Sequence, residues 1–136
     1  METSRVDYNG DLRTEVTHVK SGQAFITDAP TDNQGKGEAF SPTDLLATSL
    51  GVCAITVVGI AASAHGFNVD GTVIKVTKIM ATDPRRVGEV IVEMNFPDIK
   101  YSEKEKNIIR HTINTCPVGR SLHPDLKQTF ILNFSD

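Results

Sequence analysis

A long apolar segment that opens with a helix-capping motif constrains the fold more than any other feature of this sequence. Ser41 can accept backbone N–H groups at a helix N-cap, Pro42 suits the first helical position, and Asp44 stands three residues after the cap, as in a capping box. The pattern predicts a helix that runs to about His65 and ends at Gly66. Because its apolar residues cover nearly the whole circumference, we expect burial on all sides, by a sheet and by a second subunit.

Segments that alternate between apolar and polar residues predict strands on either side of this helix. Before it, residues 12–19 and 24–27 should form a β-hairpin with a turn at Ser21-Gly22. The polar stretch 28–40, with its prolines and glycines, should be an irregular loop. A loop of this length in a small domain usually has a function.

After the helix, residues 69–80 and 89–96 should pair as antiparallel strands, and 129–134 should be the final strand. A second capping box at Ser102-Glu103-Lys104-Glu105 predicts another helix, through about Asn114. We therefore expect an α+β fold with antiparallel sheets around a long buried central helix. A chain of 136 residues is long enough for one domain with a real core, so a single domain over residues 1–136 is predicted.

Charge and composition narrow the kinds of partner. The chain has 14 basic and 17 acidic side chains, spread without long blocks, and a formal net charge of -3. This distribution favours neither nucleic acid nor an anionic membrane surface. Residues 1–9 hold no apolar run, so no secretory signal is predicted and a cytoplasmic location is expected. Polar residues and glycines interrupt the apolar run 45–64, which is weak for a lipid-spanning helix and ordinary for a buried one.

Two cysteines, Cys53 and Cys116, are the candidate functional residues. In a reducing compartment, cysteines are more often free thiols, metal ligands or redox catalysts than a structural disulfide. Cys53 lies about three turns into the apolar helix, where it could be a small core residue. A reactive thiol there would need a cation or a donated hydrogen bond, because an apolar site raises the pKa of a thiol.

Cys116 precedes Pro117, which can start a short helix with the cysteine at its N-cap. Helix N–H groups and the helix dipole at that position could lower the thiol pKa, with Arg120 one turn later to assist. The alternative is that Cys116 ends the preceding helix and packs inward.

No metal centre and no cofactor are expected. The residues between the two cysteines contain no second pair of ligands, and the four histidines show no ligand spacing. We expect these histidines at the surface or in structural hydrogen bonds.

Two motifs, in this order, resemble those of the OsmC-like family of osmotically inducible and organic hydroperoxide resistance proteins. The first is Gly37-x-x-x-Ser41-Pro42-Thr43-Asp44-Leu45-Leu46-Ala47-Thr48-Ser49-Leu50-Gly51-Val52-Cys53, and the second is Thr115-Cys116-Pro117-Val118. The order of the predicted elements is also similar over nearly the whole chain. The resemblance implies an OsmC-like fold, an intertwined homodimer with its central helices packed together, and active sites at the subunit interface.

The resemblance also implies a thiol-dependent peroxidase that reduces organic hydroperoxides in oxidative-stress defence. Cys53 matches the peroxidatic cysteine, whose thiolate attacks the O–O bond and becomes a sulfenic acid. Cys116 matches the resolving cysteine, which condenses with that sulfenic acid to a disulfide. A dithiol reductant, of the dihydrolipoyl type in family members, would restore both thiols.

Two departures from the family pattern leave other functions open. Asp44 is a candidate catalytic acid, but the better-characterised branches carry a glutamate one residue earlier, where Thr43 stands, and helix capping is the stronger interpretation of Asp44. Those branches also supply an arginine from the N-terminal region, for which Arg13 or Lys20 would have to substitute. The alternatives are a ligand-binding or redox-sensing module on the same fold, with little or no peroxidase turnover, and a structural dimer with core cysteines.

Overall fold

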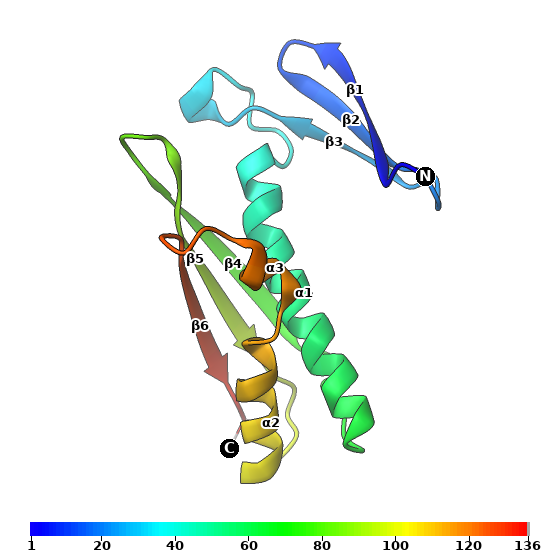
Figure 1. The fold of residues 1–136 in the computed structure, drawn as a ribbon, viewed down its shortest axis with the longest axis vertical. Coiled ribbons are helices and arrows are strands. Elements are labelled where there is room, and N and C mark those ends of the chain that lie inside the picture. Colours follow the sequence, from blue (N-terminus) through cyan, green and yellow to red (C-terminus); the bar gives the residue numbers. More distant parts are fainter. Residues whose placement is uncertain (136) are drawn as a thin grey trace. The chain divides into compact units, whose positions relative to one another are not determined.

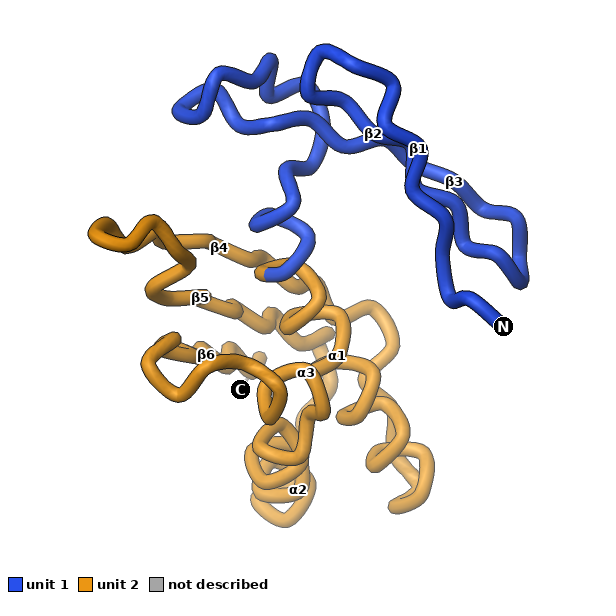
Figure 2. The backbone as a smooth tube through the Cα atoms, turned by 45° about the horizontal axis from the view of Figure 1, so that its top comes forward, with its two compact units in different colours: residues 1–46 blue, residues 47–136 orange. Residues whose placement is uncertain are grey.

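The computed structural model describes residues 1–135 and divides the chain into two compact units, 1–46 and the remainder from residue 47 (Figure 2). Figure 1 gives the order of the elements, in which the long helix α1 (Pro42–Ala64) follows three strands and precedes three more. The mixture of helices and strands confirms the predicted α+β class. Whether the chain behaves as a single domain stays a prediction.

The first unit is an antiparallel sheet in the order β1-β2-β3, made of β1 (Ser4–Gly10), β2 (Arg13–His18) and β3 (Ala24–Asp28). The predicted hairpin is confirmed, because β2 pairs with β3 around a turn in which Gly22 has a φ of 77°. Strand β1 was not predicted, because its alternating segment contains only two apolar residues, Val6 and Tyr8, and both are exposed. After β3, the predicted loop contains one short 3-10 turn, Thr31–Asn33.

Helix α1 begins and ends as its sequence predicts. The Ser41 side chain accepts the Asp44 N–H (3.1 Å) and the Asp44 carboxylate accepts the Ser41 N–H (3.0 Å), which completes a capping box. At the other end, Gly66 has a φ of 78° and donates to the Ser63 carbonyl, while Phe67 donates to the Ala62 carbonyl. This pair of bonds is a Schellman motif, in which glycine supplies the left-handed conformation without steric cost.

The second unit contains a sheet in the order β4-β5-β6, with β4 (Val73–Ala81), β5 (Arg86–Asn95) and β6 (Lys127–Asn133). Strands β4 and β5 are antiparallel, as predicted, but β6 runs parallel to β5. This sheet is therefore mixed, which corrects the expectation of antiparallel sheets throughout. The chain can return in this direction because the helices α2 (Glu103–Ile113) and α3 (Pro117–Ser121) carry it across the sheet.

The start of strand β4 differs from the prediction for a local reason, whereas α2 begins where predicted. Strand β4 begins four residues later than residue 69, because Val69 and Thr72 form a hydrogen-bonded turn that contains Gly71, with a φ of 91°. Helix α2 has the predicted capping box, with Ser102 accepting the Glu105 N–H and the Glu105 carboxylate accepting the Ser102 N–H.

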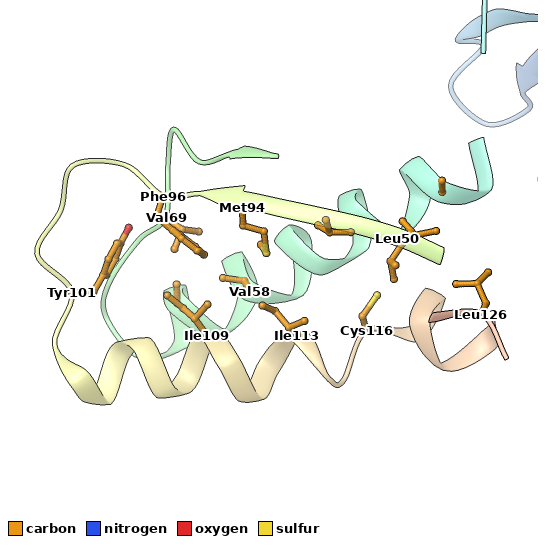
Figure 3. Packing of buried hydrophobic residues seen from close by; sticks show 14 of the residues in the cluster. Leu50, Val58, Val69, Met94, Phe96, Tyr101, Ile109, Ile113, Cys116 and Leu126 are labelled. Atoms are coloured by element: carbon orange, nitrogen blue, oxygen red, sulfur yellow. The ribbon is translucent and has the colours of Figure 1, made fainter. Parts of the chain in front are cut away.

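The core of the second unit lies between α1, α2 and the sheet (Figure 3). On β5, alternate residues are fully buried, namely Val90, Val92 and Met94. On α1, buried residues lie about one turn apart, namely Leu50, Ala54, Val58 and Ala62. Gly51 allows α1 to lie close to β4, since a Cβ at this position would lie 2.7 Å from a methyl group of Val76 on β4.

The opposite face of α1 is apolar but uncovered in the single chain. Val52 is 58% exposed and Ile60 is 67% exposed. Helix α1 is long and apolar enough to cross a membrane, and it is the one such helix in residues 1–135. The core helices of soluble proteins can have the same length and composition. The prediction that a sheet covers one side of the helix is confirmed, whereas the second covering surface stays a prediction.

Candidate functional site

The structure places Cys53 and Cys116 together in the second unit. Cys53 lies on α1 and is half-buried, and Cys116 is the N-cap residue of α3, immediately before Pro117, and is 2% exposed. Both are free cysteines, and Cys53 packs against the core cluster that contains Cys116. Figure 3 shows Cys116 at the turn between α2 and α3, beside Ile113 and in the same layer as Leu50. Two thiols that are far apart in the sequence therefore form one chemical unit, of which Cys53 is the more accessible.

The pKa of Cys116 is raised from its ordinary value, and of the two alternatives left open by the sequence, inward packing rather than a pKa lowered by the helix start describes this residue. Burial is the largest cause of the raised pKa, and the interaction with the Cys53 side chain acts in the same direction. The backbone N–H groups of Gly119 and Val118 act in the opposite direction, but burial outweighs them. Cys116 consequently remains a neutral thiol at neutral pH, and its S–H is available to donate to the sulfur of Cys53.

Gln128 was not identified from the sequence, yet it holds the turn that positions Cys116. Its side-chain amide on β6 donates to the Gly119 carbonyl at 2.8 Å. Gly119 leaves room for this contact, because a Cβ there would lie 2.7 Å from the Gln128 Oε1 atom. The parallel pairing of β6 with β5 brings Gln128 close to Gly119, and no local sequence pattern predicts this contact.

We expect Gln128→Leu to lower the free energy of unfolding by about 1 kcal/mol, because it leaves a half-buried carbonyl without its partner. Urea denaturation of the reduced protein measures this change. Thr129→Val is a matched control on the same strand, since it removes a hydroxyl group that bonds the Glu89 carboxylate rather than α3. Equal reactivity of Cys116 toward a thiol reagent in Gln128→Leu and wild type would contradict the proposed positioning of α3.

Asp44, the third predicted site residue, lies in the first turn of α1 and forms the capping box with Ser41 described above. Capping accounts for an acidic residue at this position, and a catalytic role for Asp44 stays a prediction. Among the described residues, no group of three or more histidine, cysteine, aspartate or glutamate side chains could hold a metal ion.

A second polar cluster lies in the first unit and includes Arg13, one of the two cations considered for the thiol. Its guanidinium donates to both carboxylate oxygens of Asp28, at 2.8 Å each, and lies 3.6 Å from the Glu38 carboxylate. Asp28 is almost completely buried and also accepts the Glu38 N–H at 3.2 Å. The backbone N–H of Asp28 donates to the Phe40 carbonyl. This cluster therefore ties the loop before α1 to strands β2 and β3.

The hydrogen bonds from Arg13 hold the pKa of Asp28 below its usual range, although burial opposes them. A carboxyl group whose pKa is lower in the folded than in the unfolded protein stabilises the folded protein. This stabilisation is complete at pH values above the unfolded pKa of about 3.9. It is lost as the pH falls through the pKa of the folded protein. We expect the stability of wild type to decline more steeply below about pH 4 than that of Asp28→Asn. Urea midpoints between pH 2 and pH 7 would measure both curves, and parallel curves would contradict the prediction.

Sequence and structure comparisons relate this chain to known proteins. The family model described as OsmC-like protein matches residues 35–130, which include both cysteines. The chain belongs to the OsmC-like family. Among solved OsmC-like structures, one from Psychrobacter arcticus 273-4, provisionally described as an osmotic stress induced and detoxification response protein, is 52% identical. The match has a TM-score of 0.93 and covers 98% of this chain and 96% of that one.

More distant OsmC-like structures share the fold. An organic hydroperoxide resistance protein OsmC from Legionella pneumophila is 12% identical, with a TM-score of 0.76 over 98% of each chain. An OsmC-like protein from Mycoplasma pneumoniae is 20% identical, with the same TM-score over 98% of this chain and 96% of that one. No curated protein matches the sequence. These likenesses confirm the family and the fold that the two cysteine motifs predicted.

Proposed function

We propose that this OsmC-like protein is a thiol-dependent peroxidase that reduces organic hydroperoxides through Cys53 and Cys116. The observation that carries the proposal is the packing of the more accessible Cys53 against the core cluster that contains the buried Cys116. The names of family members as organic hydroperoxide resistance proteins support the substrate class. Reducing peroxides in the cytoplasm, as part of oxidative-stress defence, is the role that fits this chemistry.

The proposed cycle has three balanced steps. The Cys53 thiolate attacks the terminal oxygen of the hydroperoxide, the O–O bond breaks, and the alkoxide leaves as an alcohol after it takes up a proton. Cys53 is then a sulfenic acid, whose sulfur Cys116 attacks to form a disulfide, with loss of water. A dithiol reductant, for which a dihydrolipoyl group is the proposed class, reduces the disulfide and becomes a disulfide itself.

Apolar surroundings favour an organic peroxide over hydrogen peroxide. Cys53 packs with the hydrophobic core, together with half-buried apolar residues such as Val57 and Val118. An alkyl or aryl group on the peroxide would gain free energy by leaving water for such a site, and hydrogen peroxide has no such group. We therefore expect kcat/KM for cumene hydroperoxide to exceed that for hydrogen peroxide by about tenfold or more, since one or two buried apolar groups are enough for that ratio.

Steady-state consumption of cumene hydroperoxide with dihydrolipoate as reductant tests the proposal. Sustained turnover that needs both the protein and the dithiol would support it. The competing function is a redox sensor, favoured by the raised pKa of Cys116, which makes Cys116 a slow nucleophile. A sensor would consume only about one equivalent of peroxide per thiol pair before the reaction stopped, and this outcome would reject the peroxidase.

A homodimer belongs to the proposal, because it would cover the exposed apolar face of α1. Ile60→Glu places a charge on that face, where Ile60 is 67% exposed in the single chain. Burying an unpaired charge costs several kcal/mol, so we expect dimer dissociation to become at least about 100-fold easier. Sedimentation equilibrium measures the change against a monomer mass of 14.8 kDa, with the exposed residue Lys104→Glu on α2 as control. A wild-type protein that stays monomeric at high concentration would contradict the prediction.

A further inference from the structure

A groove between α2 and the edge strand β6 has neither cysteine in its lining. Its cavity volume is about 380 Å³, and its lining consists of Arg110, Ile113, Asn114, Phe130, Leu132 and Phe134. This volume lies at the small end of the range of about 300–1,000 Å³ that is usual for ligand pockets. Four of these six side chains are apolar; of the two polar ones, Arg110 is on α2 and Asn114 is its C-cap residue.

Arg110 is the feature that distinguishes the groove from an ordinary apolar hollow. Its guanidinium lies 5.8 Å from the centre of the Phe134 ring and donates through Nη1 to the Asn107 side chain at 3.0 Å. Within residues 1–135 it makes no ion pair. The other cation on this ring, Lys106, lies 5.3 Å from its centre but is 3.7 Å from the Glu103 carboxylate. Of the two cations on this ring, Arg110 is therefore the one without an acidic partner among residues 1–135.

We propose that this groove binds a small monocarboxylate with an aryl or short alkyl body. A planar carboxylate matches the fork of donors on a guanidinium, and the Asn114 amide at the same rim adds a further donor. One guanidinium and one amide suit a single negative charge better than a phosphate. The body of the ligand would lie against Phe130, Leu132 and Phe134, which lose exposure to water when they are covered.

Binding of 4-phenylbutyrate to the complete Cys53→Ser/Cys116→Ser chain tests this proposal, and removing both thiols makes the result independent of any peroxidase activity. Amide NMR spectra recorded during the titration should shift at residues of α2 and β6 that line the groove. For a ligand of this size, we expect a Kd on the order of 1 mM. The neutral 4-phenylbutanamide should bind about tenfold more weakly, because it cannot pair with Arg110.

Arg110→Gln should weaken 4-phenylbutyrate binding about tenfold, whereas Lys104→Gln, an equal charge change at an exposed residue of the same helix, should leave it within about twofold. Because Arg110 is exposed, the variant should fold, and its thermal unfolding would verify this. If Arg110→Gln were unstable, Arg110→Lys, which lacks the planar fork, should show a smaller loss.

Three results would overturn the proposal. The first is the absence of shifts in the groove at 10 mM ligand. The second is equal binding of the acid and the amide, which would make the groove a purely apolar site. The third is a change of the groove signals with protein concentration in the absence of ligand, which would mean that a second copy of the chain covers it.

Discussion

Cys53→Ser should abolish the reaction of the reduced protein with cumene hydroperoxide, lowering its rate at least about 10³-fold. A serine hydroxyl at the same position cannot attack the O–O bond, because it stays protonated at neutral pH and is a poor nucleophile toward peroxide. Cys116→Ser should still react once but should accumulate the Cys53 sulfenic acid, because the residue that forms the disulfide is missing. Thiol counting and mass spectrometry after a single turnover distinguish these products.

Each variant is the control for the other, since each removes one of the two thiols of the same packed cluster. Wild type should lose two thiols for each hydroperoxide reduced. If Cys116→Ser lost its reactivity and Cys53→Ser retained it, the roles of the two cysteines would be reversed. Survival of both thiols in excess hydroperoxide would reject the catalytic proposal and favour a binding module.

Leu50→Ala should lower the free energy of unfolding by about 2–5 kcal/mol. Leu50 is fully buried on α1, one turn before Cys53, and its truncation leaves a cavity between α1 and the rest of the core. It also packs near α3, since a Cβ at Gly119 would lie 3.4 Å from a Leu50 methyl group. Urea denaturation of the reduced protein gives the change, and the loss of support under α3 should also make Cys116 more accessible to thiol reagents.

Ile131→Ala is the comparison for this prediction. Ile131 lies on β6 and is 42% exposed, so its truncation should cost about 1 kcal/mol or less. A similar loss of stability in the two variants would mean that Leu50 is not a central core residue. An unchanged midpoint in Leu50→Ala would contradict the packing of α1 against the sheet.

Local signals in the sequence were enough for the helices and for the hairpin. Ser41 with Asp44, and Ser102 with Glu105, are capping boxes whose two hydrogen bonds involve residues only three positions apart. The turn at Gly22 is equally local. These elements depend on neighbours along the chain, so their start and end could be predicted from the residues alone.

Long-range pairing explains the parts of the fold that were missed. The direction of β6 depends on the path of α2 and α3 across the sheet, and an alternating pattern is the same for a parallel and an antiparallel strand. Strand β1 has only two apolar residues, Val6 and Tyr8, and both are exposed, so its alternating pattern is too short to indicate a strand with a buried face. The carbonyl that Gln128 binds also belongs to a distant segment.

The sequence by itself determined the family, the two cysteines and the helix that carries one of them, because motifs and caps are properties of short segments. Only the tertiary structure decided that the two thiols meet and which of them is buried. It also decided the sign of the Cys116 pKa shift: the local helix start favours the thiolate, but the surrounding core excludes water from the sulfur and favours the neutral thiol. Burial is a property of the whole packed core, which no short segment encodes.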